Sequence, residues 1–597
     1  MMRNRTRQRS AFCPAFSAAS AASAALACLL FIHTGALAWE NAATRGADAL
    51  YYNGNVLTMD AATPQASAIA VREGRIVAVG NADALRAAHA GTATRAIDLG
   101  GRTLLPGFID GHSHFAQAVT LIDWANLSAP PTGHVDSIAA LLEALRTHAR
   151  THGIAPTDWV TGYGYDNEAL AEARHITRDD LDAAFPTNPV LVMHVSGHGM
   201  VLNSAALQRA GIDATTPTPA GGVIARRAGS NEPNGLLMET AMIPAFTVLP
   251  RRSAEQQMEA LDRAQQLYAS NGYTTVQDGA TSPETLTLLD TAAEHGALWL
   301  DVVTLPAVMR AKDLDQALAA PFGRYQGRHK RGGIKVISDG SPQGRTAWFT
   351  HPMHVPGPGG EAEWSGVAFI PEADYDAILA RVLAAGVPLW THANGDAAID
   401  MVIRAHERAG VRQGDDRRHV VVHSQFVRPD QLDAYQRLGL AASFFSNHAF
   451  YWGDVHLRNL GPERADQLSP MRSAHERGIR YSNHSDYSVT PLDPAMMLWT
   501  AVNRLTRSGV VLGPEERVPV QRALEALTVD AAWIYREEAE KGTLSVGKRA
   551  DFTILDRNPL TIEARRLREL RVVATVKDGR MVWGTLDTDG ATAAVGH

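Results

Sequence analysis

The chain has 597 residues, of which 45% are hydrophobic and 20% are charged, and its formal net charge is −7. This length exceeds that of one ordinary domain, and the composition is that of a globular protein rather than a disordered or fibrous one. No long basic run follows the first ten residues, which argues against a nucleic-acid partner.

The N-terminus has the pattern of an export signal. Four arginines and no acid occupy the first nine residues, an Ala/Leu-rich stretch follows, and Ala36-Leu-Ala38 is a small-x-small cleavage site. Residues 1–38 are therefore predicted to be a cleaved signal peptide, so the mature protein is expected to be periplasmic or secreted. A transmembrane anchor is the alternative, but the stretch is short and contains serines. We expect no stable membrane anchor after cleavage.

Cleavage would remove both cysteines, Cys13 and Cys28, together with the four arginines, and would take the net charge to −11. The mature chain would then have neither a disulfide nor a thiolate ligand. Any metal must therefore be held by His, Asp, Glu or a less usual ligand.

Two segments far apart in the chain are both typical of β-hairpins, because each has apolar residues on both sides of a turn of the Glu-Gly or Asp-Gly type. They are Val71–Gly80 and Val576–Gly584, flanked by strand-like runs at Leu50–Met59 and Ala550–Leu555. We predict that residues 39–102 and 541–597 together form one small β-sandwich. Two unrelated hairpins are the alternative.

Residues 103–540 alternate short apolar runs with helix-like segments, which is the pattern of a parallel α/β barrel. The eight predicted barrel strands are Thr103–His114, Thr274–Asp278, Leu298–Leu305, Gly333–Asp339, Val387–His392, His419–His423, Ala441–Phe445 and Arg480–Asp486. A ninth run, Pro189–Val195, lies within residues 115–260, an interval too long for a bare loop. The predicted fold is a (β/α)8 TIM barrel with an inserted, substrate-facing subdomain at about 115–260 and the β-sandwich.

Catalytic groups of such a barrel come from the C-terminal ends of its strands. The first predicted strand ends in Pro106-Gly-Phe-Ile-Asp-Gly-His-Ser-His114. Because residues i and i+2 of a strand point the same way, His112 and His114 would face the barrel mouth together. His392 and His423 each end an apolar run, and neutral imidazole is a good ligand for zinc and similar metals.

The segment Pro106–His114 resembles the first metal motif of the amidohydrolase superfamily. Later segments are similar to its amidohydrolase-3 branch, which includes N-substituted formamide deformylases; they are Gly333–Ser341, Thr391–Asp396, His419–Gln425, Ser485-Asp486 with Pro491–Pro494, and Gly547–Asp551. The resemblance covers nearly the whole mature chain. It implies a two-metal site whose ligands are His112, His114, Lys335, His392, His423 and Asp486, on strands one, four, five, six and eight.

Lys335 lies in the nearly apolar strand Ile-Lys-Val-Ile, where an unpaired lysine is costly. The resemblance implies that its Nζ is carboxylated and that the carbamate bridges two metals. An ion pair with a carboxylate such as Asp339 is the alternative. The loop Ser341–Thr346 departs from the usual sequence of the branch and should face the substrate, so we do not extend formamide specificity to this chain.

Asp486 ends the eighth predicted strand. A carboxylate beside a metal can bind it and also accept the proton of a bound water, so we predict that Asp486 is both ligand and general base, with His484 as an alternative ligand. His198, in Ser196–Met200, resembles a substrate-contact element of the branch. The aromatic segment from Phe444 to Asp454 either lines a pocket or serves packing.

The predicted function is hydrolysis of a non-peptide C–N bond, in a linear or cyclic amide, by water that one or two divalent cations activate, with Zn²⁺ the expected metal. The alternatives are deamination on the same site, or an exported regulator or binding protein without catalysis on the same scaffold. The expected partner is a small-molecule substrate, and the sequence leaves undecided whether the chain forms a homodimer.

Overall fold

The computed structural model describes residues 46–219, 222–358 and 360–588. The predicted signal peptide, residues 1–38, and its cleavage site lie outside these residues. Within the described ranges, no helix combines the length and the apolar character that crossing a membrane requires.

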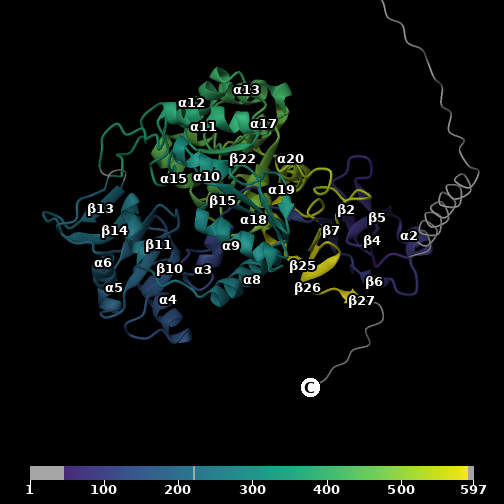
Figure 1. Ribbon diagram of the computed structural model, residues 1–597, viewed down its shortest axis with the longest axis horizontal. Coiled ribbons are helices and arrows are strands. Elements are labelled where there is room, and N and C mark those ends of the chain that lie inside the picture. Colours follow the sequence, from purple (N-terminus) through teal and green to yellow (C-terminus); the bar gives the residue numbers. More distant parts are fainter. Residues whose placement is uncertain (1–45, 220–221, 359, 589–597) are drawn as a thin grey trace, which may run out of the picture.

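Strands from both ends of the chain lie together at one end of the molecule, where purple N-terminal strands adjoin yellow C-terminal ones (Figure 1). One sheet has the order β27-β6-β1-β4-β5 and the other β26-β25-β24-β7-β2-β3. The strands are β1 (Ala49–Tyr52), β2 (Asn55–Leu57), β3 (Gln65–Ala66), β4 (Ala68–Arg72), β5 (Arg75–Gly80), β6 (Arg95–Asp98), β7 (Thr103–Pro106), β24 (Phe552–Leu555), β25 (Val572–Lys577), β26 (Arg580–Gly584) and β27 (Asp587–Thr588). Each sheet therefore needs both chain ends.

The two predicted hairpins form, as the antiparallel pairs β4–β5 and β25–β26. Their turns touch: Gly74 has a left-handed backbone (φ +73°), and a Cβ there would lie 3.0 Å from the carbonyl oxygen of Asp578. A hydrophobic cluster joins the two sheets, and in it the rings of Tyr51 and Phe552 meet edge to face with centroids 5.4 Å apart.

The remaining predicted strands lie in two sheets at the centre of the molecule, ordered β17-β18-β16-β15-β8 and β19-β20-β21-β22-β23. They are β8 (Phe108–Ile109), β15 (Tyr273–Thr281), β16 (Asp301–Pro306), β17 (Tyr325–Gln326), β18 (His329–Arg331), β19 (Ile334–Ile337), β20 (Leu389–Ala393), β21 (Val420–His423), β22 (Ala441–Phe444) and β23 (Tyr481–Asn483). Neighbours are parallel except β17 and β18. An isolated parallel bridge, Ala307 to Lys335, joins the two sheets.

Helices follow most of these parallel strands, as βα units require. They are α3 (Phe115–Leu121), α8 (Ala254–Ser270), α9 (Pro283–Glu294), α10 (Leu314–Leu318), α11 (Glu372–Ala385), α12 (Asp396–Arg408), α13 (Pro429–Leu438), α14 (His448–Tyr451), α15 (Gly453–Leu460), α16 (Pro462–Ala465), α17 (Met471–Glu476), α18 (Pro494–Asn503), α19 (Val520–Leu527) and α20 (Val529–Ile534), with α2 (Ala82–His89) beside the terminal sheets. One large hydrophobic core fills the space between these helices and the strands.

The strand predicted over residues 103–114 is wrong as a single element. Its first part, β7, pairs with β24 in the terminal sheet, whereas β8 pairs with β15 in the central one. The break falls at Gly107, which packs so closely that a Cβ there would overlap the side chain of Thr274. The boundary between the two units therefore lies at about residue 107 rather than 102.

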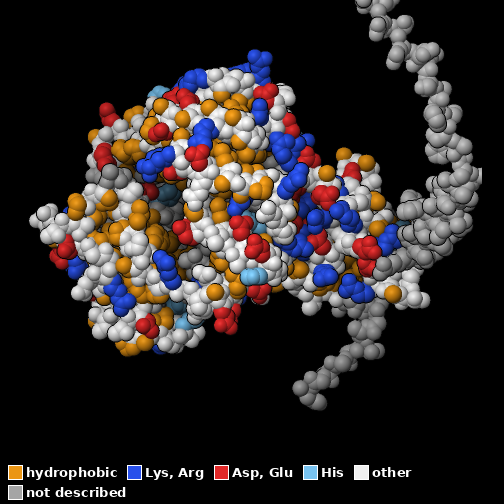
Figure 2. Space-filling view, in the orientation of Figure 1, with side chains coloured by type: hydrophobic (Ala, Val, Ile, Leu, Met, Phe, Trp, Pro, Cys, Tyr) orange, Lys and Arg blue, Asp and Glu red, His pale blue; other side chains and the backbone are white. Residues whose placement is uncertain are grey.

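The interval predicted as an insertion holds a six-stranded mixed sheet of its own, ordered β13-β14-β12-β11-β10-β9, at the end opposite the terminal sheets (Figure 1). Its elements are β9 (Ala125–Asn126), α4 (Ile138–Thr151), β10 (Val160–Tyr165), α5 (Arg178–Ala184), β11 (Val190–His194), β12 (Gly199–Leu202), α6 (Ser204–Ala210), β13 (Gly222–Arg226), β14 (Pro233–Glu239) and α7 (Ile243–Thr247). A hollow separates this subdomain from the rest of the surface (Figure 2).

The insertion is shorter than the predicted 115–260. Helices α3 and α8 lie at its two ends, yet they pack on each other, with the rings of Phe115 and Tyr268 5.4 Å apart. Both helices belong to the layer around β15, because the amphipathic face of each is buried in the large core.

A buried charge network lies at the opposite ends of the central strands from the predicted site. It consists of Asp301, Lys330, Glu537, Lys541, Asp551 and Lys577. Lys577 contacts Asp301 at 2.8 Å and Asp551 at 2.7 Å, and Lys541 contacts Asp301 at 2.7 Å. The network ties the first residue of β16 to the C-terminal segments.

Candidate metal centre

The six predicted ligands come together at the C-terminal ends of the central strands. His112 and His114 follow β8, Lys335 lies on β19, His392 on β20, His423 ends β21, and Asp486 follows β23. We count the central parallel strands as β8, β15, β16 and then β19 to β23. In this count the ligands lie on or directly after the first, fourth, fifth, sixth and eighth strands, which is the predicted distribution.

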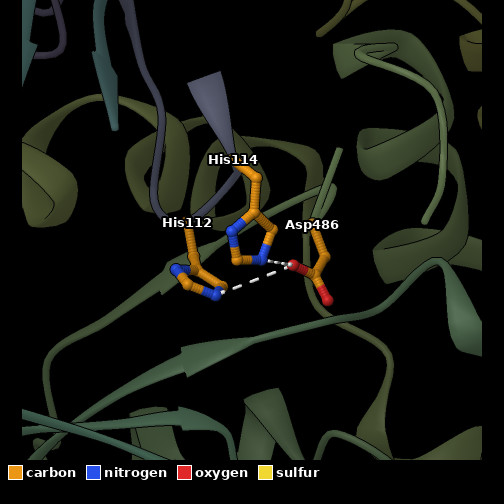
Figure 3. A group of neighbouring side chains, drawn as sticks. All are labelled: His112, His114 and Asp486. Atoms are coloured by element: carbon orange, nitrogen blue, oxygen red, sulfur yellow. Dashed lines mark ion pairs between the residues drawn. The ribbon is translucent and has the colours of Figure 1, made fainter. Parts of the chain in front are cut away.

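His112, His114 and Asp486 form one half of the cluster, with their side chains turned toward one another (Figure 3). Oδ1 of Asp486 lies 3.2 Å from Nε2 of His114 and 3.6 Å from Nε2 of His112. The same Oδ1 is buried and has no hydrogen-bond partner in the described part of the chain. A buried carboxylate oxygen without a donor is expensive, and a cation would satisfy it.

The other half is a row of imidazoles. Nδ1 of His392 lies 3.0 Å from Nε2 of His423, whose Nδ1 lies 3.1 Å from Nε2 of His484. Nδ1 of His484 in turn lies 2.8 Å from Oγ of Ser443. His423, His484 and Asp486 bring their ligand atoms within 4.8 Å of one another. His484, which the sequence suggested only as an alternative ligand, thus belongs to the cluster.

Lys335 points into the cluster. Its Nζ lies 3.1 Å from Nε2 of His112, and burial lowers the pKa of Lys335 to about 7 although Asp486 acts in the other direction. Asp339, the alternative partner, instead accepts backbone N–H groups of Trp348, Asn394 and Gly395 at 2.9 Å each. The predicted alternative, a Lys335–Asp339 ion pair, is absent from the described residues.

Two cluster residues have a left-handed backbone, which is uncommon outside glycine. φ is +70° at His423 and +50° at Asp486. Such conformations cost of order 1–3 kcal/mol and persist at functional sites, where the surrounding structure imposes them. Here they turn the two side chains at the points where β21 and β23 end.

A second set of residues fixes the orientation of His112. Its Nδ1 lies 2.6 Å from Oε1 of Gln277, whose Nε2 donates to Tyr535 Oη. Nδ1 is therefore the protonated nitrogen and Nε2 carries the lone pair, as a metal ligand requires. Gly279 leaves the ring its space, because a Cβ there would overlap it.

The electrostatics of the cluster favour neutral imidazoles beside an ionised carboxylate. Burial holds the pKa of His112 and of His423 well below its ordinary value and lowers that of His392 to about 3. Burial acts to raise the pKa of Asp486, but His114 and the other nearby histidines outweigh it and hold that pKa well below its ordinary value. Neutral imidazole and carboxylate are the ionisation states that bind metal.

His198 enters from the inserted subdomain. Its Nδ1 lies 3.0 Å from Oε2 of Glu239, and the backbone N–H of Glu239 donates to the carbonyl of His198 at 3.2 Å. Burial acts to lower the pKa of His198, but Glu239, Asp486 and Asp339 together raise it. The charged form of His198 is therefore favoured by the nearby carboxylates. Its Nε2 has no hydrogen-bond partner in the described ranges.

Glu239 and Gln277 were not singled out from the sequence. Glu239 ends β14, whereas Gln277 lies in the middle of β15, and they act on histidines that are 41 and 165 positions away, respectively. Of the aromatic segment, Phe450, Tyr451 and Trp452 line a groove, whereas His448 stacks on the ring of His456. Nδ1 of His419, the first residue of the sixth predicted strand, lies 2.9 Å from Nε2 of His406 on α12.

A family model described as the amidohydrolase family matches residues 95–583. The chain belongs to the amidohydrolase family. This confirms the resemblance that the metal motif indicated. As an amidohydrolase, the protein is a hydrolase of carbon–nitrogen bonds other than peptide bonds, which supports catalysis over a purely regulatory role.

Individual amidohydrolases are similar over nearly the full length. The N-substituted formamide deformylase of Arthrobacter pascens is 30% identical over 553 residues, covering 90% of this chain and 98% of the relative. The putative amidohydrolase YtcJ of Bacillus subtilis is 27% identical, with 90% and 99% covered. An uncharacterized metal-dependent hydrolase from Pyrococcus horikoshii has a similar fold, with a TM-score of 0.68 at 22% identity over 86% of this chain and 99% of that one. The fold is thus TIM-barrel-like α/β.

Proposed function

We propose that this amidohydrolase is a metal-dependent enzyme that cleaves linear or cyclic amides of small molecules. The observation that carries the proposal is the convergence of His112, His114, His392, His423 and Asp486 with Lys335 at the ends of five strands. These donors fit one or two divalent cations, with zinc favoured because imidazole nitrogen and carboxylate oxygen are among its usual ligands.

A divalent cation held by these residues would supply Lewis acidity, which lowers the pKa of water and polarises a carbonyl. Asp486 accepts the proton of the attacking water, because its Oδ1 has no other donor in the described residues. The same carboxyl then returns that proton to the departing nitrogen. Water thus adds across the C–N bond, and a carboxylic acid and an amine leave.

His198 is proposed as the residue that binds the substrate carbonyl, with Glu239 positioning it. The Glu239 contact fixes the tilt of the ring and favours its charged form, so that the free Nε2–H can donate to an oxygen that gains negative charge during attack. This donor belongs to the inserted subdomain, whereas the proton acceptor Asp486 belongs to the central strands.

Lys335 is proposed to be carboxylated. Carbon dioxide would form an N–C bond with the neutral amine and release a proton, which turns a cation into an anionic oxygen donor. The absence of a carboxylate partner for Nζ in the described part, and its contact with His112, support this assignment. Uncarboxylated lysine would bring a positive charge among the metal ligands.

Two finer features of the fold belong to the same proposal. The eight parallel strands β8, β15, β16 and β19 to β23 are proposed to close into a barrel; the Ala307–Lys335 bridge at one junction and the hydrogen bond from Ser443 Oγ to the Gly111 carbonyl near the other support closure. The terminal sheets are proposed to be one sandwich around their shared cluster.

We further propose export to the periplasm or medium after removal of residues 1–38. The basic, apolar and small-x-small order of that segment supports it. N-terminal sequencing of the exported protein should give Trp39 or a close neighbour as the first residue, whereas an intact Met1 in a membrane fraction would contradict export by cleavage.

The test of function is a hydrolysis screen with metal-replete mature protein on N-acyl amines, N-acyl amino acids, cyclic amides and aminated aromatic rings. Release of a carboxylate and an amine that stops on chelation and returns with metal is the expected result. Ammonia release from the aromatic rings alone would instead establish deamination. No turnover of any class by metal-replete protein would defeat the proposal.

A further inference from the structure

A groove of about 760 Å³ runs between the inserted subdomain and the segments that follow β22 and β23. Aromatic rings form much of its wall: Tyr163, Phe450, Tyr451, Trp452 and Tyr487. These rings come from both sides of the groove, since Tyr163 lies on β10 of the insertion and the others follow the central strands. The walls suit an apolar or aromatic body.

The groove adjoins the proposed catalytic centre. Tyr487, which lines it, directly follows Asp486, and its carbonyl accepts the backbone N–H of His114 at 2.9 Å. On the opposite wall, Val195 stands three residues before His198. A ligand in the groove therefore lies against the same segments that carry the proton acceptor and the carbonyl donor.

Three arginines and three acids line the groove, so its formal charges balance, but the two sets differ in their partners. Arg507, Arg568 and Arg571 line it, and in the part of the chain that the structure describes none of their guanidinium groups pairs with a carboxylate. Arg568 lies over the ring of Trp499, and Arg571 reaches only backbone carbonyls. Exposed arginines in this protein are otherwise commonly paired, as Arg404 and Arg408 are with Glu372.

The acids of the groove already have donors. Asp166 accepts the indole N–H of Trp452 at 3.2 Å, Asp493 caps α18 through the N–H of Met496 at 3.1 Å, and Glu569 pairs with Arg566 at 3.0 Å. Burial also raises the pKa of Asp166 and of Asp493, which disfavours their negative forms. The three arginines therefore remain available to an anion from outside.

Arg507 is the best placed of the three. Its guanidinium lies over the rings of Phe450 and Tyr451, at 5.7 and 5.4 Å from their centroids. The turn that carries it is fixed, because Ser508 donates its backbone N–H and its hydroxyl to Asp454 at 3.1 and 2.5 Å. A fixed cation beside aromatic walls binds a carboxylate on an apolar body with little ordering cost.

We propose that this groove is the substrate site for amides that carry a carboxylate on an apolar or aromatic body, of the N-acyl amino acid type, and that Arg507 binds the carboxylate. The proposal rests on the proposed amide hydrolysis and specifies its substrate class. The aromatic walls hold the body of the substrate, while the amide reaches the cluster beyond Tyr487.

The experiment compares N-acetylphenylalanine with its neutral carboxamide as substrates of the metal-replete protein. Arg507→Gln should raise KM for the acid about tenfold or more and leave KM for the carboxamide and both kcat values within twofold. Arg86→Gln is the matched control, because Arg86 is also an exposed arginine over a tyrosine ring, at 4.8 Å from Tyr52, but lies on α2. This variant should leave KM and kcat unchanged for both substrates.

Equal KM changes for acid and carboxamide, or none for either, would overturn the proposal. So would a KM effect confined to the Arg568→Gln/Arg571→Gln pair. A binding measurement separates this proposal from amide hydrolysis itself: calorimetry of N-acetylphenylalanine with the Asp486→Asn protein needs no turnover. Loss of binding on adding Arg507→Gln supports the groove even if no amide is cleaved, and unchanged binding refutes it.

Discussion

The central strands have a buried polar cluster at each end, and the two differ in how their charges are satisfied. At one end, the network around Asp301 matches Lys330, Lys541 and Lys577 with carboxylates at ion-pair distance. At the other end, imidazole nitrogens of His392, His423 and His484 face one another at 3.0 and 3.1 Å, and Oδ1 of Asp486 makes no hydrogen bond among the described residues.

This difference separates a structural role from a catalytic one. A buried charge that is fully paired holds two segments in one arrangement, and removing one partner is costly. A buried acceptor without a partner lowers the stability of the fold, and it is retained where a ligand completes it. Substitutions at the two ends should therefore act on different measurements, turnover at one and stability at the other.

The largest effect on turnover is expected from Lys335→Ala. The change removes the proposed bridging oxygens, so metal content should fall and turnover should become undetectable. Metal analysis together with an amide hydrolysis assay measures both. Short carboxylic acids added to the variant should restore part of the activity, because they can stand in for the carbamate. A variant with full metal content and normal rates would refute carboxylation.

Asp486→Asn should lower the rate by a hundredfold or more, because it keeps the size of the side chain and removes the proton acceptor. Metal content should be largely retained, since the histidines remain. The ratio of kcat loss to metal loss is the informative quantity. If the rate falls only in proportion to the metal, Asp486 is a ligand and not the base.

Glu239→Gln should have a smaller and pH-dependent effect. The folded pKa of His198 is raised, so the charged ring is lost as pH rises through that pKa, and without Glu239 the loss starts at lower pH. The basic limb of kcat/KM should move toward acid, with about a tenfold loss at pH 8, the worth of one charge-assisted hydrogen bond. Glu232→Gln is the control, because Glu232 pairs with the exposed Arg227. It should leave the pH profile of kcat/KM unchanged.

Asp301→Asn should leave turnover per folded molecule unchanged and lower stability by about 3–5 kcal/mol, because it leaves buried lysines short of a partner. Burial acts to raise the pKa of Asp301, but Lys541 and Lys577 hold it far below its ordinary value. The network therefore stabilises fully above about pH 4 and weakens as pH falls. Thermal melting checks this, with the exposed Glu372→Gln as a control expected to cost below about 1 kcal/mol. A rate loss in Asp301→Asn at unchanged melting would contradict the division of roles.

The sequence predicts best what local pattern encodes. His112 and His114 are two residues apart on one segment, and Lys335 stands out in an apolar strand, so each is visible without knowledge of its partners. The partners Gln277 and Glu239 are not, because their contacts depend on how distant strands align. The division of the first predicted strand was missed for the same reason: the apolar run is continuous, and only the pairing of β7 with β24 separates it from β8.

Arg507 illustrates the remaining limit. Its sequence neighbourhood, Leu505-Thr-Arg-Ser508, has no motif, and exposed arginines are common on any surface. Its interest arises from what is near it and what is not: aromatic rings from other segments, and acids that are bonded elsewhere. That Arg507 has no carboxylate partner among the described residues can be recognised only in the folded chain.

The pairing of the chain ends also sets an order in time. The N–H of Phe108 donates to Oγ1 of Thr553, 445 residues later, and β7 has β24 as a neighbour. During synthesis, the early strands therefore keep an open edge until β24 has emerged. Open edges recruit other strands, and contacts this distant close slowly. The pairing of β24 with β7 is thus the closing step of assembly, and chains that stop short of β24 should be recovered as aggregates rather than as smaller soluble enzymes.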